Sequence, residues 1–138
     1  MNDGTTILLI EDDDVAAEAV ERRLLKNGIE LPLVHAGNGV VALELLRTSP
    51  RLRNVPIIIL LDLNMPRMNG FEFLRELKAD PTLSTLVVFV LTTSDAPADR
   101  VRAYGEGIAG YLVKSEVGHH RDLLAALLRA YSEAVTLP

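Results

Sequence analysis

Acidic, hydroxyl and basic side chains follow four separate apolar segments of this chain. The run TTILLI leads into four acids, Glu11 to Asp14, and the run IILL leads into Asp62. Thr92 and Thr93 follow VVFVL, and Lys114 follows YLV. Carboxylates that converge repel one another unless a cation binds or a proton is shared, and a few hard oxygens with room for water suit Mg²⁺. A lysine and a hydroxyl nearby indicate an anionic oxygen group as the other occupant. These are the parts of a phosphoryl-transfer site.

The apolar segments have the length and composition of buried strands, and helical patterns lie between them. We predict strands over residues 5–10, 31–36, 57–61, 86–91 and 111–113. Helices are predicted to run from a cap at Asp13 or Asp14 to Asn27, and then over 40–46, 71–79, 97–106 and 119–134. The first helix is expected to turn Val15, Ala19, Leu24 and Leu25 towards the core, and the third to turn Phe71, Leu74 and Leu77 inward. A short extra turn of helix is allowed within residues 47–56.

Strands that alternate with helices predict an α/β fold, with a parallel sheet covered by helices on both faces. The nearly continuous apolar strands agree, because strands of such a sheet are buried on both sides. The functional crevice of this architecture lies beyond the carboxyl ends of the strands. We therefore expect the polar groups that follow the strands to gather at one edge.

Composition excludes several classes of function. The chain has 138 residues, a net charge of −5 and no cysteine, so thiol catalysis and disulfides are ruled out. An acidic chain lacks the basic footprint of a nucleic-acid or anionic-lipid binder. The longest strongly apolar run, Val55 to Leu61, is far shorter than the ~20 residues that span a bilayer. The first residues, MNDGTTILLIEDDD, have no basic leader and are not expected to be a signal peptide. We expect one cytoplasmic domain over residues 1–138, with no nucleic-acid or membrane partner.

Four motifs, taken in order, resemble the receiver domain of two-component response regulators. They are ILLIEDD, IILLDLNMPRMNGFEFL, VVFVLTTS and GYLVKS, and the resemblance covers essentially the whole chain. It implies a doubly wound, flavodoxin-like (βα)5 fold with strand order 2-1-3-4-5 and no output domain. It also implies a stand-alone phosphorylation switch rather than an enzyme in the usual sense, with a sensor histidine kinase as phosphoryl donor.

The resemblance assigns a metal site and a phospho-acceptor. Asp62 matches the aspartate that accepts the phosphoryl group. Glu11 and Asp12 match the acidic pair that holds Mg²⁺, and the backbone carbonyl of Asn64 matches a further protein ligand. The acidic stretch is longer than two residues, so the pair could instead be Asp12 and Asp13; Asp12 belongs to either choice.

The resemblance also assigns a switch. Thr92 matches the hydroxyl that reaches for the phosphoryl group, Lys114 matches the lysine that pairs with it, and Tyr111 matches the aromatic whose rotamer follows Thr92. Pro66 and Gly70 match the loop that shapes the phosphorylation site. The surface of the fourth helix, fifth strand and fifth helix would then change with phosphorylation.

The chain departs from the family at one position, where Ser115 replaces the proline that often follows the lysine. This serine, the TTS motif and a longer loop before the third strand resemble the small regulators that pair with bacterial phytochrome histidine kinases. A histidine phosphotransfer protein and a downstream target are further candidate partners. A homodimer through the fourth and fifth helices is a further expectation from the resemblance.

Two other functions remain open on the sequence. A receiver-shaped scaffold could bind a partner without phosphorylation, although the retention of every site residue argues against it. A Mg²⁺ phosphohydrolase of the haloacid dehalogenase type also places Asp after a strand. That family has a second Asp two residues later, where this chain has Asn64, and carries a cap insert for which the chain is short.

Other side chains have plainer interpretations. His35, His119 and His120 are expected in solvated or capping roles, because no second cluster of ligands lies near them in the sequence. Thr93 stands where it would fill space beside the site or slow the access of water.

Overall fold

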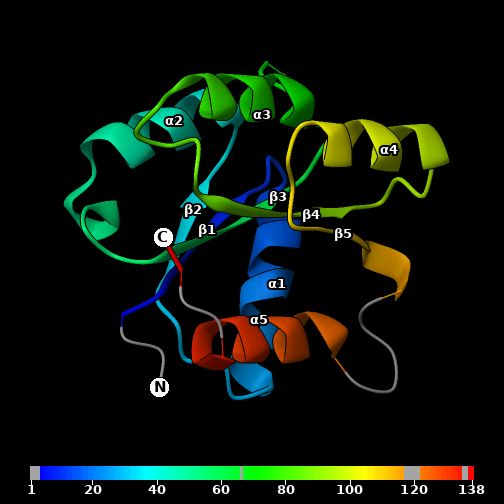
Figure 1. Ribbon diagram of the computed structural model, residues 1–138. Helices are drawn as coiled ribbons and strands as arrows, with labels where there is room; N and C mark the ends of the chain where they lie inside the picture. The colour runs from blue at the N-terminus through cyan, green and yellow to red at the C-terminus, as the bar shows by residue number, and fades with distance from the viewer. Residues whose placement is uncertain (1–3, 66, 117–121, 135–136) are drawn as a thin grey trace.

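A five-stranded parallel sheet forms the centre of the computed structural model, which describes residues 4–65, 67–116, 122–134 and 137–138 (Figure 1). The strands follow the five apolar runs of the sequence, and β1 and β3 are buried along their whole length. Their bounds are β1 Thr6–Ile10, β2 Leu33–Ala36, β3 Ile57–Leu61, β4 Val87–Thr92 and β5 Gly110–Val113. The strand order is β2-β1-β3-β4-β5, which confirms the predicted fold class.

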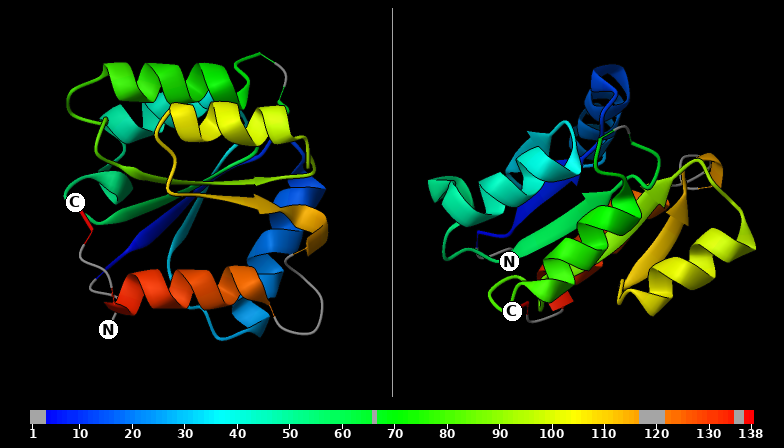
Figure 2. Two further views of the ribbon diagram at one scale, coloured as in Figure 1. Left: turned by 45° about the vertical axis from the view of Figure 1, so that its right-hand side comes forward. Right: turned by 90° about the horizontal axis from the view of Figure 1, so that it is seen from above.

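Helices connect the strands and cover both faces of the sheet. They are α1 Asp14–Lys26, α2 Gly39–Thr48, α3 Gly70–Ala79, α4 Pro97–Gly105 and α5 Leu123–Ala134. One apolar cluster joins α2, α3 and α4 to one face, and a second joins α1 and α5 to the other face (Figure 2). The strand order reverses between β1 and β3, and this switch point is where sheets of this kind place their functional crevice.

Two side-chain caps hold the helices that begin next to this crevice. Asp13 caps α1, because its carboxylate accepts from the backbone N–H groups of Val15 (2.9 Å) and Ala16 (3.3 Å). Asn69 and Glu72 form a reciprocal capping box at the start of α3. Each cap satisfies N–H groups that a helix start leaves without partners. The capping prediction is confirmed for Asp13, and both loops that leave the switch point are fixed at their far ends.

The predicted core face of α1 is confirmed at Leu24 and wrong at its other three positions. Val15 is 73% exposed and Leu25 is 61% exposed, and Ala19 also faces solvent. The helix instead packs on the sheet through Ala17, Val20 and Leu24. Both sets of residues have helical spacing, so periodicity alone does not select the buried one. The inward residues of α3 are as predicted, with Phe73 buried as well.

The remaining differences are small shifts of element ends. β2 begins at Leu33 rather than at residue 31, because Pro32 has no N–H to donate to a sheet ladder. The allowed extra turn is a 3₁₀ helix, η1 Pro50–Leu52, and a second, η2 Lys114–Glu116, follows β5. The predicted start of the last helix, at His119 and His120, lies outside the described residues. In the described part of the chain, every helix is too short or too polar to cross a membrane.

Candidate functional site at the carboxyl edge of the sheet

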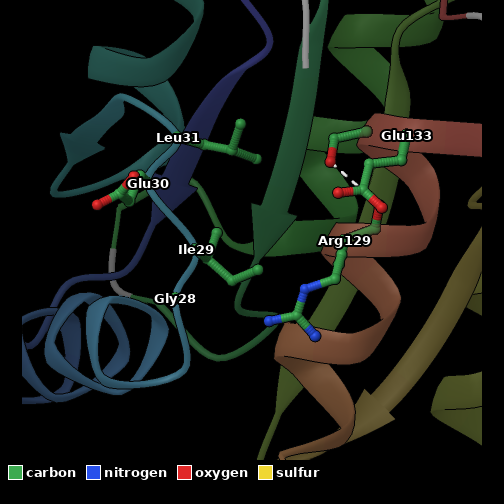
Figure 3. A pocket seen from close by; sticks show the side chains of 7 residues that line it. Gly28, Ile29, Glu30, Leu31, Arg129 and Glu133 are labelled. Atoms are coloured by element: carbon green, nitrogen blue, oxygen red, sulfur yellow. Dashed lines mark hydrogen bonds between the residues drawn. The ribbon is translucent and has the colours of Figure 1, made fainter. Parts of the chain in front are cut away.

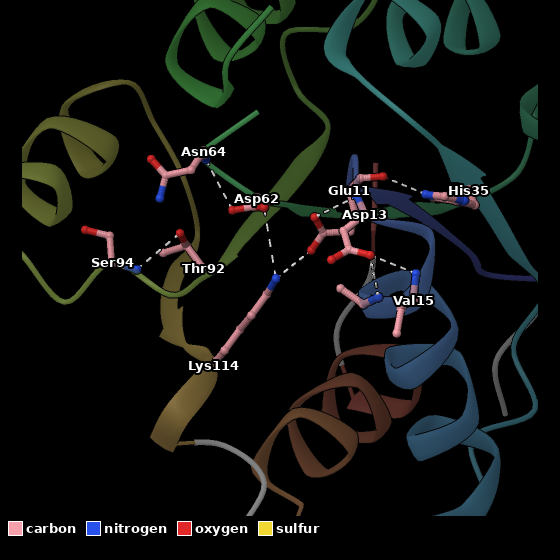
Figure 4. A network of polar contacts seen from close by, with 10 residues as sticks. Glu11, Asp13, Val15, His35, Asp62, Asn64, Thr92, Ser94 and Lys114 are labelled. Atoms are coloured by element: carbon pink, nitrogen blue, oxygen red, sulfur yellow. Dashed lines mark hydrogen bonds and ion pairs between the residues drawn. The ribbon is translucent and has the colours of Figure 1, made fainter. Parts of the chain in front are cut away.

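Three carboxylates meet where β1 and β3 end. Glu11 and Asp12 follow β1, Asp62 follows β3, and one carboxylate oxygen of each lies within 4.8 Å of the others. Glu11 and Asp62 are buried, with 3% and 8% of their surface exposed, whereas Asp12 is open to solvent. The parallel pairing of Ile10 with Leu61 ends both strands at the same level, which brings Glu11 and Asp62 together (Figure 4). A cluster of two buried acids and one accessible acid has the hard oxygen donors that a small divalent cation prefers.

Lys114 brings a positive charge into this cluster from the end of β5. Its Nζ lies 2.5 Å from Oε1 of Glu11 and 4.0 Å from Oδ2 of Asp62 (Figure 4). The lysine side chain is 25% exposed, so its amine spans the gap between the two acids while remaining reachable from solvent. This single cation offsets part of the repulsion among three carboxylates. The cluster can therefore form without a metal and keeps spare negative charge for one.

The pKa of Asp12 is raised above its ordinary value. Desolvation is the first cause, followed by the hydrogen bond with the Glu11 side chain and by the negative charges of Glu11 and Asp13. A carboxyl held in this way favours either a proton or a nearby cation.

The loop after Asp62 folds back tightly over the site. The N–H of Asn64 donates to Oδ1 of Asp62 (3.2 Å), and the N–H of Gly70 donates to the carbonyl of Leu63 (3.0 Å). A Cβ at Gly70 would lie 2.7 Å from Cα of Leu63 and 2.9 Å from the carbonyl oxygen of Asp62. The loop can close on Asp62 only because position 70 has no side chain. Pro66, predicted to shape the same loop, lies outside the described residues.

Thr92 and Tyr111 are linked through Ser94. Thr92 is fully buried at the end of β4, and its Oγ1 accepts from the N–H of Ser94 (3.4 Å). The hydroxyl of Tyr111 donates to the carbonyl oxygen of Ser94 (2.9 Å), and the Ser94 hydroxyl donates to Asp99 (2.6 Å). The tyrosine ring is half-buried against the α2–α3–α4 cluster. One loop residue thus connects the hydroxyl beside the site to the aromatic side chain on β5 and to α4.

Sequence reasoning missed two features of the site. Ser94 and its bond to Asp99 were not singled out, although a serine two residues after a strand end is a common turn former. His35 is exposed, in agreement with its expected solvated role, but sequence reasoning missed that its Nε2 lies 2.7 Å from the backbone oxygen of Glu11 (Figure 4). The peptide that joins Lys114 to Ser115 is trans, since the described residues contain no cis bond.

A separate hollow lies between the α1–β2 connection and α5, near the amino ends of the strands (Figure 3). It measures about 200 Å³, and its charged lining residues are Glu30, Arg129 and Glu133. The guanidinium of Arg129 is already engaged, because its Nη2 donates to the carbonyl of Asn27 (2.5 Å). The mixed charges of this hollow offer no convergence of acids and lysine like that at the carboxyl edge.

Comparison with known proteins shows which family the sequence matches. Residues 7–128 match the family model for the response regulator receiver domain. The curated protein response regulator Rcp1 of Synechocystis sp. is 34% identical to this chain, over 99% of this chain and 95% of Rcp1.

Solved structures with this fold include three of similar length. The Mn²⁺-bound form of Rcp1 has a TM-score of 0.77 at 34% identity, covering 96% of this chain and 98% of that one. The phosphorylated cyanobacterial phytochrome response regulator RcpA has a TM-score of 0.80 at 30% identity, and the match covers 96% of this chain and 97% of RcpA. Response regulator RPA3017, described in red light signaling of R. palustris, has a TM-score of 0.83 at 29% identity, and the match covers 97% of this chain and 98% of RPA3017.

Proposed function

This chain belongs to the response regulator receiver domain family, and from that membership and the geometry of the site we propose that Asp62 accepts a phosphoryl group from a sensor histidine kinase. One observation carries the proposal: a buried Asp62 lies with Glu11 and Asp12 within 4.8 Å, and Lys114 lies 4.0 Å from its carboxylate. A nucleophile, a cation site and a positive charge thus share one crevice. The proposed role is a signalling switch.

The proposed transfer uses the Asp62 carboxylate as nucleophile. One of its oxygens forms a bond to phosphorus as the bond from phosphorus to the kinase histidine breaks, and the electron pair of that bond stays on the histidine nitrogen. The amine of Lys114 balances charge on the phosphoryl oxygens, which frees it from part of its pairing with Glu11. The carboxylates of Glu11, Asp12 and Asp62 and the backbone carbonyl of Asn64 would hold Mg²⁺. Bound Mg²⁺ would neutralise phosphoryl oxygens.

The switch is proposed to run through Ser94. The Thr92 hydroxyl donates to a phosphoryl oxygen on Asp62, and this movement displaces the loop that carries Ser94. Because the Tyr111 hydroxyl donates to the Ser94 carbonyl, its hydrogen-bond acceptor then changes position. Helix α4 follows readily, because Ala103 is the one described residue that it buries. The surface of α4, β5 and α5 then differs between the two states, and a downstream target or a histidine phosphotransfer protein reads the difference.

Mass spectrometry of the intact protein tests the acceptor. Incubation with acetyl phosphate and Mg²⁺ should add the mass of one phosphoryl group to the wild-type chain. The addition should be absent in Asp62→Asn and in the presence of EDTA, whereas Asp95→Asn, which changes an exposed acid outside the cluster, should behave as wild type. If acetyl phosphate adds nothing, beryllofluoride provides a stable mimic. Failure to bind this mimic as well would refute the proposal in favour of a phosphorylation-independent scaffold.

We propose a phytochrome-type histidine kinase as the donor. The support is similarity: RcpA is described as a cyanobacterial phytochrome response regulator and RPA3017 as a component of red light signaling. A purified, radiolabelled phytochrome kinase should transfer its label to this chain within seconds. Equal or faster transfer from kinases of unrelated sensor classes would contradict this assignment without touching the role of Asp62.

A homodimer through α4 and α5 is part of the proposal. Val101 and Tyr104 on α4 are 72% and 48% exposed, and Leu123 on α5 is 48% exposed. Large apolar side chains at these positions suit a surface that becomes covered. Sedimentation velocity should show a dimer that beryllofluoride strengthens and that Val101→Asp weakens; a monomer at high micromolar concentration in both states would exclude it.

A further inference from the structure

We infer that His35 is a positioning residue for the acidic pair, holding the peptide between Glu11 and Asp12 in the orientation that lets both carboxylates serve one cation. The inference deepens the proposed function and rests on it. His35 lies on β2, a strand that supplies no acid, hydroxyl or lysine to the site. Its contact is with the backbone and not with any of the proposed ligand atoms.

The direction of the contact is fixed by chemistry. Nε2 of His35 lies 2.7 Å from the carbonyl oxygen of Glu11 (Figure 4). A carbonyl oxygen accepts only, so Nε2 carries the proton and donates. Both the neutral ring with its proton on Nε2 and the charged ring satisfy this requirement. The contact is therefore kept whether the ring is neutral or charged.

The contact falls where the strand ladder stops. The last paired residues of β1 and β2 are Ile10 and Ala36, and the carbonyl of Ala36 accepts from the N–H of Glu11 (3.0 Å). Beyond this point β2 has no backbone N–H in register for the Glu11 carbonyl. The side chain of His35, which pairs with Leu9 one step earlier, reaches forward and supplies that donor. Two neighbouring residues of β2 thus hold the N–H and the carbonyl of Glu11.

The held peptide controls Asp12. The carbonyl of Glu11 and the N–H of Asp12 belong to the same planar peptide unit. A hydrogen bond that holds the carbonyl therefore also fixes the orientation of the backbone at Asp12. Glu11 has other anchors: it is buried, and Lys114 pairs with it. Asp12 is exposed, and the next residue, Asp13, is committed to capping α1. Apart from the hydrogen bond with the Glu11 side chain, the direction of the Asp12 carboxylate therefore depends on the backbone that His35 holds.

Ligands of metal sites are commonly oriented by partners outside the coordination shell. Here the orienting group acts on a backbone carbonyl, so only a donor of the right length can replace it. Glutamine carries an amide nitrogen at a reach like that of Nε2, whereas asparagine is one bond shorter and leucine has no donor. The comparison of His35→Gln with His35→Asn keeps polarity constant and changes only reach.

Mn²⁺ binding provides the first readout. Titration of the full chain, with free Mn²⁺ counted by electron paramagnetic resonance, should show binding about 3- to 10-fold weaker in His35→Leu and His35→Asn. His35→Gln should stay within about twofold of wild type, as should the control Glu18→Gln, which lines the same hollow as His35 without contacting Glu11. Urea midpoints measured in EDTA should be alike for His35→Gln and His35→Asn, which separates positioning from loss of fold.

The amide nitrogen of Asp12 provides a readout that needs no metal. Its NMR chemical shift responds to the hydrogen bond on the Glu11 carbonyl, so it should move in His35→Asn and return in His35→Gln. Equal Mn²⁺ affinity in His35→Gln and His35→Asn, or an unmoved Asp12 resonance, would overturn the role of His35 and leave the proposed function intact. Absence of Mn²⁺ binding in the wild-type protein would instead overturn the proposed function itself.

Discussion

At the scale of single residues, Gly70 determines how closely the loop after β3 can approach Asp62. We expect Gly70→Ala to lower the free energy of unfolding by about 1–3 kcal/mol, because its Cβ would meet backbone atoms of Leu63 and Asp62 that cannot turn away. Urea denaturation measures this loss. Phosphorylation by acetyl phosphate should slow in the same variant, since relief of the clash moves Asp62.

Gly105 supplies the matched control. It lies in α4, and a Cβ there would meet no atom within 4 Å. Gly105→Ala should be neutral or stabilise the protein by roughly 0.5–1 kcal/mol, the ordinary gain in helix propensity. Equal destabilisation by both substitutions would show that the contacts of Gly70 are not the cause.

Residues that follow strands were the easiest part of the site to predict. Glu11, Asp62 and Lys114 each come directly after an apolar run, and parallel strands bring such positions to one edge whatever the details of packing. The contact of His35 could not be found in this way. It depends on the register that pairs His35 with Leu9 and on how far an imidazole reaches past the end of a strand. The sequence contains neither quantity.

At the scale of the elements, β5 is tied to the loop between β4 and α4 by one hydroxyl. Tyr111→Phe removes the bond to the Ser94 carbonyl and keeps the ring. We expect a loss of about 0.5–1.5 kcal/mol in the free energy of unfolding and faster hydrogen exchange in residues 93–96. Hydrogen exchange read by mass spectrometry checks this. Unchanged exchange in that loop, with normal exchange elsewhere, would mean that the tyrosine does not restrain it.

The end of α3 carries a pH-dependent contribution to stability. The pKa of Asp80 is lowered from its ordinary value of 3.8, first by the Thr82 hydroxyl, then by the Thr82 N–H and by Arg47. Because the folded-state pKa is depressed, the ionised carboxylate stabilises the fold above pH 3.8, and the contribution is lost as the pH falls through the lowered pKa.

Asp80→Asn should therefore be less stable than wild type at pH 7, and the difference should shrink as the pH falls below about 4. Urea unfolding at both pH values measures it. Thr82→Val removes the hydroxyl and keeps the N–H donor, so it should show the same trend with a smaller amplitude. A difference between wild type and Asp80→Asn that stays constant with pH would point to a cause other than the charge of Asp80.

The phase of a helix was harder to predict than its existence. The limits of α1 were close to those predicted, yet Val15 and Leu25 face solvent. The sheet is covered by Ala17, Val20 and Leu24, of which only Leu24 was predicted. Both sets of residues have helical spacing, so periodicity alone does not choose between them.

At the scale of the whole molecule, cation binding should be visible as stability. A ligand that binds only the folded state adds about 2.7 kcal/mol at a concentration 100 times its Kd, which corresponds to roughly 8–10 °C in Tm for a domain of this size. Differential scanning calorimetry with saturating Mg²⁺ should show this rise in wild type. The rise should largely vanish in a variant that carries both Asp12→Asn and Asp62→Asn, whereas the same shift there would place the cation elsewhere.

The ion pair between Lys114 and Glu11 joins residues 103 positions apart. It links the first strand to the last, so neither half of the chain contains a complete site. If the polypeptide were divided in the turn between α4 and β5, each fragment would be chemically silent, and the reactivity of Asp62 would return only when the fragments associate. The carboxyl edge can thus serve as a built-in reporter of reassembly, giving a chemical signal for the moment at which the sheet is complete.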